Sequence, residues 1–149
     1  MGFRVPGNFG SPFHSRNIQE FWTRWHITLS QWLRDYFYYP FLKRLMKTFR
    51  VSHIALPASA IFLTFILMGL WHDFTLTNLC YGVYHGAGLA CFMVFTDRTR
   101  NTKAGAWMRS SWIWRGIAII ITIHFCFLSF LVFCGKFIPF SETLRIHNG

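Results

Sequence analysis

The fold is decided by an uncharged stretch over residues 54–71, which reads IALPASAIFLTFILMGLW. It contains neither Asp, Glu, Lys nor Arg. A helix needs about 20 predominantly apolar residues, and at least about 17, to cross the hydrocarbon core of a bilayer. We therefore expect a membrane-spanning helix at 54–71.

Two further stretches of this kind follow. Residues 77–95 and 116–135 also lack charged side chains, and neither shows the alternating pattern of a barrel strand, so both read as helices. The first of the two is semi-polar because it contains His85 and several glycines, and the spacing of Gly82 and Gly86 permits close packing against another helix. The expected fold class is all-α integral membrane, with three transmembrane helices.

The composition supports this prediction and explains the charge. Hydrophobic residues make up 53% and charged residues 13%, whereas soluble domains average about 25% charged. The net charge is +10. Nine cations flank the expected spans in two segments that two crossings place on one side, and the positive-inside rule makes that side cytoplasmic (Lys43, Arg44, Lys47, Arg50, Arg98, Arg100, Lys103, Arg109, Arg115). Because topology accounts for the charge, we expect contact with membrane lipids and no nucleic-acid partner.

Residues 17–39 predict a different element. Asn17 with Glu20 three residues later fits a helix N-cap. Apolar and aromatic side chains then recur at spacings of three and four, with polar residues between them (Trp22, Trp25, Leu29, Trp32, Leu33, Tyr36). We expect one amphipathic helix that lies at the interface or re-enters the membrane and ends at Pro40. His26 falls inside its apolar stripe.

Histidines occur at membrane depth. His72 follows directly after the first expected span, and His85 and His124 lie within the other two. Ionisable groups in a membrane are costly and are functional candidates, although interhelical hydrogen bonding is the favoured interpretation of His85 and His124. The HExxH and CxxC patterns are absent, so neither a metal nor a cofactor is expected. A neutral imidazole can act as a general base toward a hydroxyl.

Two segments resemble a known family. Residues 21–36 read FWTRWHITLSQWLRDY, and residues 68–72 and 81–86 read MGLWH and YGVYHG. In this order they resemble the two signature motifs of the membrane-bound O-acyltransferase (MBOAT) family. Because members of that family are much longer, the resemblance implies that residues 1–149 form the C-terminal portion of such a domain.

The resemblance implies acyl transfer through the membrane of a bacterial cell. An acyl carrier protein would bring a thioester from the cytoplasmic side, and a polymer or lipid-linked acceptor would meet it from the outer side. His72 is then the expected general base or acceptor-positioning residue, and His26 its partner. The residues expected to shape the substrate tunnel are Trp25, Trp71, Arg24 and His85.

The branch of the family is indicated by residues 127–136, FLSFLVFCGK, which most resemble the D-alanyl transfer (DltB-type) proteins. That branch implies an acceptor such as teichoic acid. The alginate-type O-acetyltransferase branch is similar in the first motif, but residues 40–44 stand where its glycine-rich turn is usual. Both branches usually have glycine where this chain has Asp73.

Two other classes of protein remain open. One is an inactive truncated membrane subunit. The other is a channel or transporter segment that uses intramembrane histidines for protons, which would explain His85 and His124 but not the two ordered motifs.

Overall fold

Three long helices dominate the computed structural model, which describes residues 7–49 and 54–133. They are α4 (Ala55–His72), α5 (Leu76–Thr99) and α7 (Trp112–Phe133), and each is long and apolar enough to cross a membrane. Among the described residues the only β-pairing is an isolated bridge between Phe9 and Trp25. The predicted all-α membrane fold class is confirmed, although α5 and α7 extend beyond the predicted spans into charged flanks. Residues 134–135 of the third predicted span lie outside the described residues.

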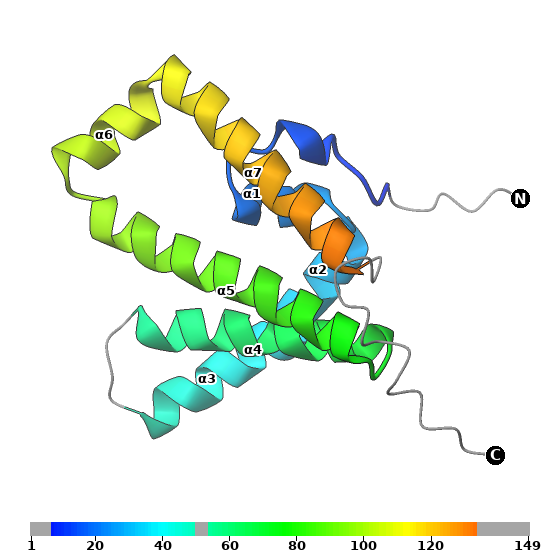
Figure 1. Cartoon of the computed structure of the whole chain (residues 1–149). Helices are drawn as coiled ribbons and strands as arrows, with labels where there is room; N and C mark the ends of the chain where they lie inside the picture. Colours follow the sequence, from blue (N-terminus) through cyan, green and yellow to red (C-terminus); the bar gives the residue numbers. More distant parts are fainter. Residues whose placement is uncertain (1–6, 50–53, 134–149) are drawn as a thin grey trace, which may run out of the picture.

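Helices α4 and α5 run side by side and are connected by a short link (Figure 1). Glycines allow their backbones to approach closely. A Cβ atom on Gly82 would lie 2.5 Å from the carbonyl oxygen of Phe65, and one on Gly86 would lie 2.8 Å from that of Phe62. A Cβ on Gly69 would meet the carbonyl oxygen of Asn78. The pair is therefore packed backbone to backbone, as the Gly82–Gly86 spacing predicts.

Residues 17–39 do not form the single helix that was predicted. The chain folds into α1 (Ile18–Arg24), α2 (Ile27–Leu33), a π turn η2 (Arg34–Tyr38) and α3 (Tyr39–Thr48). The predicted N-cap is confirmed, because the Asn17 side chain accepts a hydrogen bond from the Glu20 amide at 2.8 Å. The helix breaks at His26, whose φ of 49° is left-handed.

The prediction that Pro40 ends the helix is also wrong, since this residue lies in the first turn of α3. A proline inside a regular α-helix clashes with the carbonyl group four residues before it. Here the Tyr39 amide bonds to the carbonyl of Arg34 instead, which makes a wider π turn immediately before the proline. The π turn therefore divides the apolar stripe. Leu33, before the turn, is buried, whereas Tyr36, within it, is exposed.

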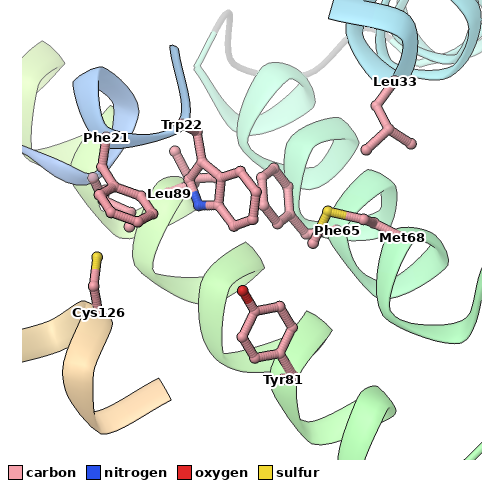
Figure 2. Packing of buried hydrophobic residues seen from close by; sticks show 9 residues of the cluster. Phe21, Trp22, Leu33, Phe65, Met68, Tyr81, Leu89 and Cys126 are labelled. Carbon is pink, nitrogen blue, oxygen red and sulfur yellow. The ribbon is translucent and has the colours of Figure 1, made fainter. Parts of the chain in front are cut away.

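The core lies where α1 packs over the long helices. Figure 2 shows Trp22 between Leu89 of α5 and Phe65 of α4, with the Tyr81 ring below it. Cys126 of α7 points toward Phe21. A short 3-10 helix η1 (Pro12–His14) leads into α1, and α6 (Lys103–Ser110) connects α5 to α7.

The two basic segments lie on the same side of the molecule. Figure 1 shows α3 and the start of α4 on the same side as the end of α5 and α6. The cations of 43–47 and of 98–115 therefore flank the same ends of the membrane-length helices.

Candidate functional site

His26 is held in its left-handed conformation by the segment that precedes α1. Positive φ costs energy for a residue with a Cβ atom, so it persists only where the surroundings fix it. The carbonyl oxygen of Asn8 accepts a hydrogen bond from the Ile27 amide at 3.0 Å. The Asn8 side chain oxygen accepts from the amide and the hydroxyl of Thr28, at 3.2 and 2.6 Å. Asn8 thus supplies the cap of α2 that the His26 side chain does not provide.

The imidazole of His26 lies beside an aromatic side chain of the same segment. Its ring centroid is 5.8 Å from that of Phe9, which also packs edge-on against Trp25. Nδ1 of His26 is buried and has no hydrogen-bond partner among the described residues. The ring is therefore positioned by packing, with one nitrogen left for a further partner.

Trp25 and Arg24 both have contacts within the fold. The Trp25 ring meets four other rings from η1, α1, α7 and the preceding segment (Phe9, Phe13, Phe21, Phe130). Arg24 forms an ion pair with Glu20 at 2.6 Å, one helical turn away. These contacts explain both side chains structurally, and their role in a tunnel stays a prediction.

His85 joins the two motifs. Its Nδ1 accepts a hydrogen bond of 3.3 Å from the indole N–H of Trp22, so the interhelical bond expected for His85 is present. An indole nitrogen only donates, and we therefore assign the proton of the neutral imidazole to Nε2. The side chain is 1% exposed, and five rings surround it (Trp22, Phe65, Tyr81, Tyr84, Phe125). Nε2 has no hydrogen-bond partner among the described residues.

His124 differs from that expectation. Its Nδ1 lies 2.8 Å from the carbonyl oxygen of Ile120, within the same helix, and its side chain is exposed.

His72 is the last residue of α4, and its side chain is exposed. Its ring packs against Trp71 with centroids 5.2 Å apart, and Trp71 is itself 63% exposed. The following Asp73 has extended backbone with φ of −172°, which any residue adopts. The link to α5 therefore does not require the glycine that is usual there.

The described contacts bring the two motifs together at Trp22 and His85. They connect His26 with Phe9 and His72 with Trp71. The pairing of His26 with His72 stays a prediction.

A cavity of about 430 Å³ is lined by residues of α1, α2, η2 and the start of α3 together with residues of α4 and α5. Its lining combines hydroxyl, amide and guanidinium groups with apolar side chains (Gln19, Trp22, Thr23, Ile27, Ser30, Gln31, Leu33, Arg34, Tyr38, Tyr39, Ile61, Thr64, Phe65, Leu89, Met93). None of the four predicted tunnel residues is among them. Trp22 and Phe65, which contact His85, are.

Two polar side chains of the cavity, Tyr38 and Arg34, stay protonated at neutral pH because the pKa of each is raised. Burial raises the pKa of Tyr38, so its hydroxyl remains a hydrogen-bond donor. A hydrogen bond from the Arg34 guanidinium to Asp35, together with the charge of that carboxylate, raises the pKa of Arg34. Sequence reasoning placed none of these lining residues at a site, because it treated 17–39 as one continuous helix.

Within residues 7–49 and 54–133, no three side chains of His, Cys, Asp or Glu gather closely enough to hold a metal ion.

The fold and the histidines define a multi-pass membrane protein with polar groups buried between its helices. The chain belongs to the membrane-bound O-acyltransferase (MBOAT) family, whose model matches residues 3–135. The predicted family is thereby confirmed.

Curated relatives carry three kinds of name. The chain is 37% identical to "Teichoic acid D-alanyltransferase" of Bacillus subtilis over 95% of its length and 35% of that protein. It is 33% identical to "Peptidoglycan O-acetyltransferase" of Helicobacter pylori over 100% of its length and 25% of that protein. It is 44% identical to "Probable alginate O-acetylase AlgI" of Pseudomonas aeruginosa over 60% of its length and 16% of that protein. The chain spans about a third of the length of the teichoic acid D-alanyltransferases it matches.

Proposed function

We propose that the chain carries part of the acyl-transfer site of a membrane-bound O-acyltransferase. The enzyme moves a D-alanyl group from a carrier-bound thioester to a hydroxyl of an extracytoplasmic polymer such as teichoic acid. One observation carries the choice of acyl group, namely the 37% identity with a teichoic acid D-alanyltransferase over 95% of the chain, which includes both histidine motifs.

The reaction exchanges one acyl bond for another. The acceptor oxygen bonds to the thioester carbonyl carbon, and the carbon–sulfur bond breaks. The hydroxyl proton passes to the imidazole of His72 and from there to the leaving sulfur, so the products are an ester and a free carrier thiol. This role is supported by the exposed side chain of His72 at the end of α4 opposite the basic segments, where an outer acceptor would arrive. His26 is its proposed partner.

The donor would enter from the basic side. Lys43, Arg44 and Lys47 are exposed on α3, and a cationic surface attracts an acidic carrier protein. Helix α3 begins at Tyr39, which lines the 430 Å³ cavity. From Phe65 on the cavity wall to His72 is about 10 Å along α4, at 1.5 Å per residue. The polar lining of the cavity suits the arm that carries a thioester.

Substitution of His72 in the complete protein tests the proposal. We expect His72→Ala and His72→Gln to lower the formation of D-alanine esters at least about 100-fold, the usual contribution of a general base. The matched control is His124→Ala, which removes an exposed histidine of α7 and should retain transfer. Full polymer acylation by His72→Ala would refute the assigned role.

O-acetyl transfer is the second candidate, because the alginate and peptidoglycan relatives are 44% and 33% identical to the chain. Membranes that contain the complete protein are supplied either with a D-alanyl-loaded carrier or with an acetyl donor. The acyl group on the product polymer is then identified. We expect the D-alanyl ester to form. If only the acetyl ester forms, the activity is O-acetyl transfer and the D-alanyl proposal is wrong.

The 149-residue chain expressed alone serves to test the inactive-subunit alternative. In a strain that lacks the corresponding gene, we expect this chain by itself to form no D-alanine esters. Restored esters would show that these residues suffice.

A further inference from the structure

Helix α6 packs against the end of α5 through a helix cap, a close glycine contact and a side-chain hydrogen bond. The hydroxyl of Thr102 accepts a hydrogen bond from the Gly105 amide at 3.0 Å and caps the helix. Gly105 packs so closely on the carbonyl group of Thr99 that a Cβ atom would not fit. The guanidinium of Arg109 donates to the carbonyl oxygen of Arg100 at 3.0 Å. The connection between α5 and α7 is thus an ordered helix held by its own contacts, and it presents a defined surface.

This surface combines cations with indole rings. We call it the α6 surface and define it by its exposed members (Arg98, Arg100, Lys103, Trp107, Arg109, Trp112, Arg115). Residues 97–115 contain these five cations and one acid, Asp97. Trp107 is 55% exposed and Trp112 is 80% exposed, which is unfavourable for large apolar rings in water.

The position of Trp112 gives the depth of the surface. It is the first residue of α7, which is long and apolar enough to span a membrane. If α7 spans the bilayer, its end is where the lipid headgroups are expected. Tryptophan is enriched at that level of a bilayer. Arg115 follows Trp112 within one turn. Figure 1 shows α6 between the C-terminal end of α5 and the N-terminal end of α7. The cations therefore lie where lipid phosphates would be.

We propose that the α6 surface binds the phosphodiester headgroups of anionic phospholipids. Its positive charge complements them, and its indoles enter the interfacial layer beside them. An acidic protein could also match the charge, but the headgroup depth of Trp112 favours lipid. The proposal does not depend on which acyl group the enzyme transfers.

Lipid binding to the purified complete protein tests this inference. The protein in detergent is titrated with phosphatidylglycerol or with phosphatidylcholine, and bound lipids are counted by native mass spectrometry. The variant Arg98→Gln/Arg100→Gln/Lys103→Gln removes three exposed charges. The matched control Lys43→Gln/Arg44→Gln/Lys47→Gln removes the same charge from α3.

We expect the unmodified protein to prefer phosphatidylglycerol. Each cation near an anionic surface contributes about fivefold in affinity, so the triple α6 variant should bind this lipid about 100-fold more weakly. The α3 control should lose less affinity than the α6 variant, because α3 contains no tryptophan to seat its cations among the headgroups. Arg98→Lys/Arg100→Lys should bind as the unmodified protein does.

Three results would overturn the inference. They are the absence of a preference for phosphatidylglycerol in the unmodified protein, an equal loss in the α3 control, and a triple α6 variant that keeps phosphatidylglycerol while it loses an acidic protein partner. The last result would assign the surface to a protein.

Discussion

The indole nitrogen of Trp22 donates a hydrogen bond to Nδ1 of His85 across 3.3 Å, and this bond joins residues 63 positions apart in the two signature motifs. The Trp22 ring also packs edge-on against Phe65, with centroids 4.9 Å apart. One side chain of α1 thus connects α4 and α5. Because His85 is buried within a cage of rings, the bond orients an imidazole that water cannot reach.

Replacement of Trp22 by phenylalanine should destabilise the protein by about 1–3 kcal/mol, the cost of a buried polar atom that loses its partner. The aromatic packing is partly retained, whereas Nδ1 of His85 is left without its donor. Thermal unfolding of the complete protein in detergent measures the difference. Trp32→Phe, at an exposed ring of α2, should stay within about 0.5 kcal/mol. Equal losses would show that the hydrogen bond contributes little.

The close approach of α4 and α5 predicts that Gly82 tolerates no side chain. The Cβ of Gly82→Ala would lie 2.5 Å from the carbonyl oxygen of Phe65, and two packed helix backbones would have to separate. We expect a loss of about 1–3 kcal/mol in unfolding free energy. Gly116→Ala in α7 is the control, because nothing lies within 4 Å of its Cβ and alanine favours a helix. Unfolding of both variants at the same temperature as the unmodified protein would refute the tight contact.

The membrane spans could be predicted because the bilayer itself imposes their length and composition. The uncharged stretch at 54–71 becomes α4 at Ala55–His72, and the glycines of 82 and 86 indicate a packed rather than a lipid-facing helix. The position of the basic segments at one end follows from the same constraint, since an even number of crossings separates them.

The shape of the first motif could not be predicted, because its conformation depends on a segment without periodicity. The 3.6-residue pattern continues through His26, but Asn8 and its neighbours bind the backbone on both sides of that residue and break the helix. With α1 and α2 separated, Thr23 and Gln31 contribute to the lining of a cavity while they remain exposed. The periodicity of a segment describes that segment alone. It contains no information about hydrogen bonds from residues 8–10 to the backbone beside His26.

Asn8 should therefore be required for the geometry of the first motif. Asn8→Ala removes the acceptor for the amide and the hydroxyl of Thr28, and loss of a helix cap of this kind costs about 1 kcal/mol. We expect lower thermal stability together with weaker acyl transfer. Asn101→Ala, at an exposed turn before α6, should change neither. Unaltered stability of Asn8→Ala would mean that the backbone bonds alone hold the break.

The left-handed backbone of His26 allows its structural and chemical roles to be separated. Glycine adopts a φ of 49° without strain, whereas alanine does not, and neither residue retains the ring contact with Phe9. We expect the free energy of unfolding of His26→Gly to be about 1 kcal/mol higher than that of His26→Ala. The reason is that a residue with a Cβ atom costs about that much in the left-handed conformation. If the imidazole takes part in acyl transfer, both variants lose D-alanine ester formation despite this difference in stability. If His26 serves only to shape the chain, activity should follow stability, and His26→Gly should transfer more than His26→Ala.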